Sequence, residues 1–239
     1  MSVRVGVVVF PGTNCEHDVV GALRTVCEKR GLEVDAELVW HGRTSLEGFD
    51  ALVLPGGFAH GDYLRPGAIA RFSPVMEPLA RFAESGGTVI GICNGFQVLT
   101  EADLLPGALQ KNQGLRFLCK EVEVRVCSTR NGLTREMEPG ERLWLPINHF
   151  EGNYTCDPAT LELLQAEDRV VLRYEENPNG SLGDIAGVCN AEGNVVGLMP
   201  HPERACDALT GRLDGARLLG SWLATLVGAR GRAHATLGI

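Results

Sequence analysis

The feature that most constrains the fold is an alternation of short apolar segments with longer segments of helical character in the first half of the chain. Residues 3–10 are almost continuously hydrophobic, as is typical of a strand buried on both faces of a sheet. Three further strands are predicted in this half, at residues 34–40, 51–54 and 88–92. Strands that alternate with helices predict an α/β fold with a mostly parallel, twisted sheet and helices on both faces.

Helices are expected between these strands. The first is predicted to run to Arg30, with Thr13 or Asn14 as the capping residue and Gly31 as the residue that ends it. Two others are expected at residues 69–84 and 94–104.

The second half is richer in strands and ends in a helix. Strands are predicted at residues 121–127, 143–147, 170–174, 185–189 and 195–198, and an amphipathic helix at residues 213–227. Because no linker or internal repeat divides the chain, we expect one domain over residues 1–228 and a C-terminal tail over residues 229–239.

Composition and charge argue against several classes of protein. The net charge of −8 leaves no basic footprint for a general nucleic-acid binder, and no apolar run approaches the roughly 18 to 20 residues of a membrane span. The eight cysteines include no Cys-x-x-Cys pair, so a zinc ribbon or a thioredoxin-type motif is not expected. The first residues do not resemble a secretory leader. We therefore expect a cytoplasmic protein with reduced thiols and no membrane or nucleic-acid partner.

The most specific local motif follows the fourth predicted strand and reads Gly91-Ile92-Cys93-Asn94-Gly95. Glycines two residues before and after a nucleophile are typical of the strand-to-helix turn called a nucleophile elbow, here with cysteine in place of serine. The N-terminus of the following helix favours a thiolate, and the N–H of Asn94 could stabilise an oxyanion. The motif also fits an ordinary turn that contains a buried cysteine.

A thiol nucleophile needs a base, and a base is usually held by a third group. His201 and Glu203 directly follow the predicted strand at residues 195–198, held between prolines. Because parallel strands end at one edge of a sheet, we expect both side chains to lie near Cys93.

A pair of glycines, Gly56 and Gly57, follows the third predicted strand and allows the backbone to approach a ligand closely. It is a candidate for the second half of an oxyanion hole. The chain has neither a phosphate loop nor a dinucleotide fingerprint, so we expect no cofactor and no metal in it.

These three motifs, in this order and spacing, resemble the class I, or triad, glutamine amidotransferases. The resemblance implies a flavodoxin-like α/β fold and the hydrolysis of L-glutamine to glutamate and ammonia through a thioester. It implies Cys93 as nucleophile, His201 as base and Glu203 as the carboxylate that orients the base. It further implies an oxyanion hole from Gly57 and Asn94, and a glutamine pocket formed by Gly56, Gln97, His149, Phe150 and Gly152.

Three further segments, residues 11–18, 61–68 and 147–152, are similar to a narrower group, the glutaminase subunits of phosphoribosylformylglycinamidine synthases of purine biosynthesis. That likeness implies delivery of ammonia to a separate synthetase subunit, which uses ATP and Mg to convert formylglycinamide ribonucleotide to the amidine, and a small third subunit. Phe150 departs from the His-Gly-Glu-Gly sequence more common in relatives. We expect a partner face that includes Asn14, Asp62, Tyr63 and Arg65.

Other functions stay open from the sequence. One is a class I glutaminase subunit of another biosynthetic pathway. Another is a cysteine hydrolase or chaperone-like protein with the same elbow and no amidotransfer, although many of those carry histidine where this chain has Asn94. A third is a binding or regulatory subunit without catalysis, which would be expected if a triad residue were missing.

Overall fold

The computed structural model describes residues 2–237, with the backbone alone described at residue 210 and at residues 232–237. Its centre is a nine-stranded sheet in the order β2-β1-β3-β4-β11-β10-β9-β6-β7, and a second sheet pairs β5 with β8. The strands are β1 (Val3–Val9), β2 (Val34–Trp40), β3 (Ala51–Leu54), β4 (Thr88–Ile92), β5 (Ala108–Gln110), β6 (Leu118–Val126), β7 (Arg142–His149), β8 (Asn153–Thr155), β9 (Val170–Tyr174), β10 (Ile185–Cys189) and β11 (Val195–Leu198).

The large sheet is parallel in five of its nine strands. Strands β2, β1, β3, β4 and β11 pair in parallel with their neighbours. All four residues of β3 and of β11 are buried, as expected for parallel strands covered on both faces. The remaining strands, β10, β9, β6 and β7, continue the sheet in antiparallel pairs. The prediction of a mostly parallel sheet with extra strands from the second half is therefore confirmed.

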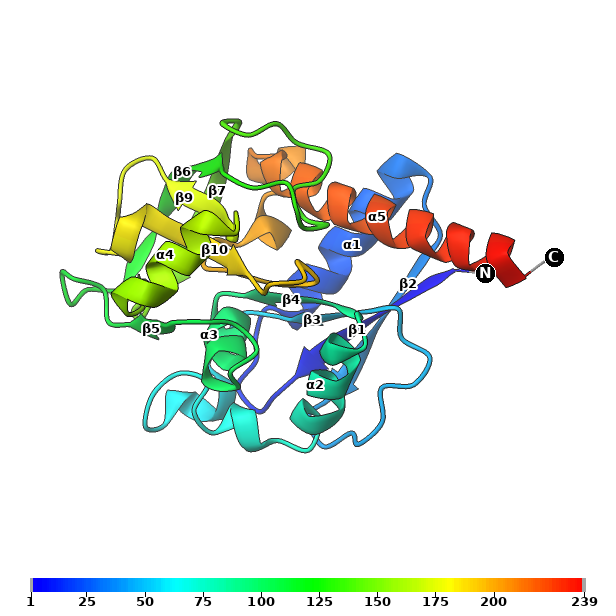
Figure 1. Ribbon diagram of the computed structural model, residues 1–239, viewed down its shortest axis with the longest axis horizontal. Helices are drawn as coiled ribbons and strands as arrows, with labels where there is room; N and C mark the ends of the chain where they lie inside the picture. The colour runs from blue at the N-terminus through cyan, green and yellow to red at the C-terminus, as the bar shows by residue number, and fades with distance from the viewer. Residues whose placement is uncertain (1, 238–239) are drawn as a thin grey trace.

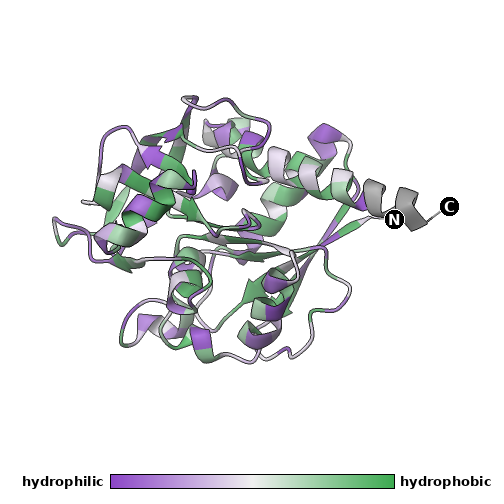
Figure 2. Ribbon diagram, in the orientation of Figure 1, coloured by the Kyte–Doolittle hydropathy of each residue, from purple (hydrophilic) through white to green (hydrophobic). Residues whose placement is uncertain are grey.

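Helices cover both faces of the parallel half. In Figure 1, α1 (Glu16–Arg30) and α5 (Asp214–Leu237) lie above the sheet, whereas α2 (Met76–Glu84) and α3 (Asn94–Glu101) lie below it. Figure 2 shows hydrophobic residues concentrated along the strands and on the helix faces turned toward them. Among the helices described over residues 2–237, none has the length and apolar composition that crossing a membrane requires.

Two helix starts differ from their predictions. Neither Thr13 nor Asn14 caps α1, because the Thr13 hydroxyl instead accepts a hydrogen bond from the Phe10 N–H at 3.0 Å. The helix predicted at residues 69–84 is two helices, a short 3₁₀ helix (Ala70–Phe72) and α2. Pro74 disfavours helical conformation in the residue before it, and Ser73 is extended with φ −65° and ψ 144°.

Other boundaries differ as well. Gly31 ends α1 in the left-handed conformation with φ 65°, as predicted, and α3 ends at Glu101, earlier than predicted, shortly before Asp103 at φ 57°. The sequence patterns predicted neither α4 (Pro158–Ala166), whose start is capped by Asp157, nor the short strands β5 and β8.

The last helix is longer than predicted. It continues beyond Val227 to Leu237, through most of the segment that was expected to be a tail. The prediction relied on an apolar period, which fades where the helix extends beyond the core, but alanine and arginine still favour helix there. Arg230 bonds to the Ser2 carbonyl at 2.6 Å and to the Asp50 carboxylate, which ties this part of α5 to the start of the chain. The domain boundary at residue 228 stays a prediction.

Trp222 of α5 is one of the largest fully buried side chains and tests how far this helix stabilises the fold. Trp222→Ala should lower the free energy of unfolding by about 3–5 kcal/mol, since it leaves a large cavity. Trp40→Ala is the matched control, because Trp40 is 56% exposed, and it should change stability by less than about 1 kcal/mol. Urea unfolding of both variants measures the difference. Equal losses would show that α5 does not pack as described.

Candidate active site

Four parallel strands end at one edge of the sheet and bring the chemistry-bearing segments together. Strand β1 leads to residues 10–15, β3 to Gly56 and Gly57, β4 to Cys93, and β11 to His201 and Glu203. Ligand sites in open α/β sheets lie at this carboxyl edge. The backbone topology therefore brings these motifs to one edge of the sheet, as expected.

Cys93 sits in a strained turn between β4 and α3. Its φ of 50° and ψ of −105° lie outside the conformations that non-glycine residues ordinarily adopt. The turn is possible because Gly91 and Gly95, two residues before and after Cys93, have no side chains and allow close packing. A Cβ on Gly95 would lie 1.9 Å from the Leu54 carbonyl oxygen, and one on Gly91 would lie 2.7 Å from the Gly95 backbone. The predicted nucleophile elbow is thus present in geometry as well as in sequence.

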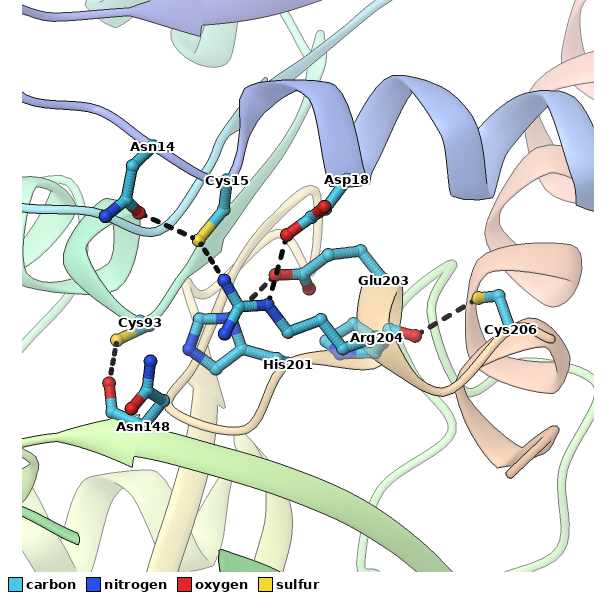
Figure 3. Close-up of polar contacts among 10 residues, drawn as sticks. Asn14, Cys15, Asp18, Cys93, Asn148, His201, Glu203, Arg204 and Cys206 are labelled. Atoms are coloured by element: carbon cyan, nitrogen blue, oxygen red, sulfur yellow. Dashed lines mark hydrogen bonds and ion pairs between the residues drawn. The ribbon is translucent and has the colours of Figure 1, made fainter. Parts of the chain in front are cut away.

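The Cys93 side chain is buried, and its thiol lies 3.7 Å from the Asn148 carbonyl oxygen, which accepts its hydrogen bond (Figure 3). Cys93 also precedes the first turn of α3, where backbone N–H groups lack intrahelical acceptors. A thiolate or an oxyanion formed here would face these N–H groups and the positive end of the helix dipole.

His201 and Glu203 form a close, fully buried pair. His201 Nδ1 and Glu203 Oε1 are 2.6 Å apart, and both side chains are almost completely shielded from solvent. Burial lowers the pKa of His201, but the negative charge of Glu203, with the Cys93 and Cys15 sulfurs, outweighs it and raises the pKa well above its usual value. With Nδ1 bonded to the carboxylate, the His201 Nε2 atom has no partner among residues 2–237 and is free to exchange a proton.

An outer set of side chains surrounds this pair (Figure 3). Arg204 donates through Nη2 to the Cys15 sulfur at 3.1 Å and through Nε to the Asp18 carboxylate at 3.1 Å. Cys15 in turn donates to the Asn14 side-chain oxygen at 3.2 Å. These contacts join the start of α1 to the segment that carries His201 and Glu203, so residues 14–18 support the buried pair.

The donor atoms of Cys15, His201 and Glu203 lie within 4.8 Å of one another, close enough to hold a metal ion. The same donors are already bonded to one another or to the Arg204 guanidinium, which places a fixed positive charge beside the position a cation would take. The geometry therefore favours a hydrogen-bonded network over a metal centre.

A cavity of about 180 Å³ opens beside Cys93. It is smaller than the roughly 300–1,000 Å³ of sites for drug-sized ligands, so it suits a small molecule. Its lining consists of Gly57, Phe58, Asp62, Pro66, Cys93, Gln97, Asn148, His149, Phe150 and Glu151. A larger hollow of about 620 Å³ near the starts of β4 and β11 has neither cysteine nor histidine in its lining and offers no comparable chemistry.

His149 is held in a single tautomer. The Asn112 amide nitrogen donates to the carbonyls of Arg116 and His149, so its oxygen must accept the bond from His149 Nδ1 at 3.1 Å. Burial and the nearby His201 lower the pKa of His149 to about 4. His149 is therefore neutral near pH 7, with an unprotonated Nε2 that is buried and has no partner in the described part of the chain.

The structure brings most predicted pocket residues together, but in different ways. Gln97 donates to the Glu151 carbonyl at 2.5 Å and accepts from Asn94 at 2.9 Å, which fixes its side chain at the cavity. Gly56 and Gly152 instead provide space. A Cβ on Gly56 would lie 2.8 Å from the His201 ring, and one on Gly152 would lie 2.2 Å from the His149 ring.

The residues predicted for a partner face separate into two groups. Asn14, Tyr63 and Arg65 are exposed, with Tyr63 at 74%, and Arg65 forms a double hydrogen bond to Glu101 at 2.5 and 2.7 Å. Asp62 differs, because its half-buried carboxylate lines the cavity and accepts a bond from Asn94 at 3.2 Å.

The sequence patterns indicated no role at this site for Asn112, Cys15 or Arg204. Asn112 lies far from any motif, and its role depends on the return of β7 and the following loop toward the cavity. Cys15 lies within the segment at residues 11–18, and Arg204 directly follows Glu203. The position of Arg204 beside the predicted catalytic pair was the signal that could have identified it.

Comparisons with known proteins agree with this geometry. Residues 2–222 match the family described as the CobB/CobQ-like glutamine amidotransferase domain. The phosphoribosylformylglycinamidine synthase subunit PurQ of Rubrobacter xylanophilus is 60% identical over 221 residues, which covers 92% of this chain and 98% of that protein. The corresponding subunit of Koribacter versatilis is 50% identical, with coverage of 93% and 98%. A chain of the solved PurLQS structure from Thermotoga maritima is 41% identical with a TM-score of 0.85, covering 95% of this chain and all of that one.

The close packing of Gly95 yields the first prediction for the site. Gly95→Ala would force the Cys93 turn and β3 apart, because the new Cβ would overlap the Leu54 carbonyl oxygen. We expect a loss of stability of about 3 kcal/mol and loss of thiol reactivity toward iodoacetamide at Cys93. Gly21→Ala is the control, since a Cβ there meets nothing within 4 Å beyond its own stretch of helix, and alanine favours helix α1. A stable, reactive Gly95→Ala protein would refute the elbow geometry.

A second prediction concerns pH. The folded chain binds a proton at His149 only near pH 4, whereas the unfolded chain does so near its usual pKa of 6.5. Stability should therefore fall as the pH drops below about 6.5, and His149 should contribute on the order of 2 kcal/mol of that loss between pH 7.5 and 5. His149→Asn should remove this part of the slope. Urea unfolding at both pH values tests it, and identical slopes for the two proteins would contradict it.

Proposed function

The chain belongs to the CobB/CobQ-like glutamine amidotransferase family, and on that premise we propose that it is the glutaminase subunit of a phosphoribosylformylglycinamidine synthase of purine biosynthesis. The observation that carries the proposal is the position of Cys93, whose elbow lines a pocket of amino-acid size and whose thiol lies beside the buried His201–Glu203 pair (Figure 3). A nucleophile, a base and an orienting carboxylate in this arrangement serve acyl transfer.

The reaction begins with the Cys93 thiolate, whose proton has passed to His201 Nε2. The sulfur attacks the side-chain amide carbon of glutamine and forms a tetrahedral intermediate. Backbone N–H groups of Gly57 and Asn94 stabilise the resulting oxyanion. His201 then gives its proton to the amide nitrogen, the carbon–nitrogen bond breaks, and ammonia leaves a γ-glutamyl thioester on Cys93.

Hydrolysis of the thioester completes the cycle. His201 Nε2 takes a proton from water, the hydroxide attacks the thioester carbon, and the carbon–sulfur bond breaks to release glutamate. Glu203 keeps the proton of His201 on Nδ1 and stabilises the imidazolium that forms in both halves of the reaction. The 2.6 Å contact between these two side chains supports that role.

The pocket residues contribute to glutamine binding in different ways. Gln97 is fixed by Asn94 and by the Glu151 carbonyl, so it offers a pre-positioned amide to the substrate. His149, Phe150, Gly57 and Phe58 all line the cavity. Gly56 and Gly152 keep the two histidine rings free of side-chain overlap.

The ammonia produced here is useful only if it reaches a second active site before it is protonated in bulk water. We propose that a synthetase subunit receives it and supplies the ATP and Mg sites, that a small third subunit completes the complex, and that the assembly lies in the reducing cytoplasm. The exposed side chains of Tyr63 and Leu64, at 74% and 89%, lie next to cavity residue Asp62 and offer an apolar contact for the synthetase. The eight free cysteines fit a reducing compartment.

Release of glutamate from glutamine tests the function. Cys93→Ala should abolish it, and Glu203→Gln should lower kcat by about 10²–10⁴-fold, since the base loses its orienting charge. Cys119→Ala is the control, because Cys119 is an exposed thiol on β6 outside the cavity. The assay is run with and without the synthetase subunit. Glutamate release that persists in Cys93→Ala would overturn the assignment.

A further inference from the structure

We propose that Asp62, together with Glu151, binds the α-ammonium group of the substrate and thereby restricts the site to amides of α-amino acids. The inference rests on the proposed glutaminase function and adds the residues that determine its specificity. Asp62, which was predicted to belong to a partner face, is thereby assigned to the substrate pocket.

The first support is position. Asp62 and Glu151 come from separate loops, one after β3 and one after β7, yet both line the 180 Å³ cavity that contains Cys93. Asp62 is connected to the elbow itself, because its Oδ1 accepts from the side chain of Asn94, the residue after the nucleophile, at 3.2 Å. A substrate whose amide lies at Cys93 can therefore present its other end to these carboxylates.

The second support is the way the fold holds Asp62. Three non-glycine residues of this loop, His60, Asp62 and Leu64, have positive φ values of 52°, 53° and 70°. Each costs roughly 1–2 kcal/mol of backbone strain, and aspartate is among the residues that tolerate it best. The loop is anchored by the Ala59 N–H, which donates to the Asn94 side-chain oxygen at 3.0 Å. The strained loop thus holds the Asp62 carboxylate at the cavity before any ligand arrives.

The third support is charge. Among the described residues that line the cavity there are two carboxylates and no lysine or arginine. The charge of Lys111, which lies outside the lining, offsets only part of the effect of burial on the pKa of Glu151. Burial, followed by the charge of Glu151, raises the pKa of Asp62 to about 6, and burial raises the pKa of Glu151. Both carboxyl groups are thus less stable as anions than they would be in water. A bound ammonium group would offset the repulsion between the two carboxylates and stabilise their charged forms.

A fourth observation concerns a hydrogen-bond acceptor in the wall of the cavity. His149 also lines it, and its unprotonated Nε2 is buried without a partner in residues 2–237. A buried acceptor without a donor is costly unless a ligand satisfies it. A ligand with N–H donors, such as a side-chain amide and an ammonium group, can satisfy both His149 and the Asp62–Glu151 pair.

The test compares two amides in the complex with the synthetase subunit. L-Glutamine carries the α-ammonium group, whereas glutaramate, its analogue without that group, does not. Wild type should prefer glutamine in kcat/KM by about 10²-fold or more. In Asp62→Asn this preference should fall to within a few-fold, with the loss for glutamine mainly in KM.

Asparagine tolerates the left-handed conformation, so Asp62→Asn should keep the loop. Asp168→Asn is a matched control, because Asp168 is an exposed aspartate with a similar φ of 56° outside the cavity, and it should keep the full preference. Alkylation of Cys93 by iodoacetamide reports whether the elbow is intact. If Asp62→Asn keeps the wild-type preference, or loses activity equally on both amides, the proposal is overturned. If wild type hydrolyses neither amide, the glutaminase function fails as well.

Discussion

The site depends on one close approach between two stretches of backbone. Gly95, at the start of α3, lies against the Leu54 carbonyl at the end of β3, with no room for a side chain between them. This contact presses the first turn of the helix onto the sheet and forces Cys93 into its strained conformation. The same packing keeps the Gly56–Gly57 turn beside the nucleophile, because that turn begins directly after Leu54.

The two halves of the sheet contribute different parts of the chemistry. The parallel half supplies the nucleophile and the base at its carboxyl edge. The antiparallel half supplies another part of the cavity lining, because β7 ends at His149 and Glu151 follows in the next loop. The two halves are joined by the pairing of β11 with β10, and His201 adds a contact near the site, because its N–H donates to the Pro146 carbonyl of β7 at 2.8 Å. Proline is tolerated there because β7 is the edge strand of the sheet.

Local sequence rules were sufficient for the parallel strands, for Gly31 as a helix end and for the elbow at Cys93, because each depends on neighbouring residues. They failed where local structure or side-chain position is determined by residues that local patterns do not take into account. Pro74 divides a region with helical periodicity, and α5 continues past Val227 without an apolar face to signal it. Asn112 sets the tautomer of His149 from a separate loop. Asp62 faces the cavity because of a backbone strain that its sequence neighbours do not reveal.

The place of β11 in the sheet affects the order in which the protein can be made. This strand is the last in sequence, yet it lies near the middle of the sheet, between β4 and β10. A chain growing on the ribosome therefore carries an open slot beside the strand that ends at Cys93 until almost all of it has been synthesised. The base and its carboxylate follow directly after β11, so the same late event closes the sheet and completes the reactive site. A nascent chain that ends before His201 would hold a cysteine without a base, and ammonia could not be released before the sheet is closed.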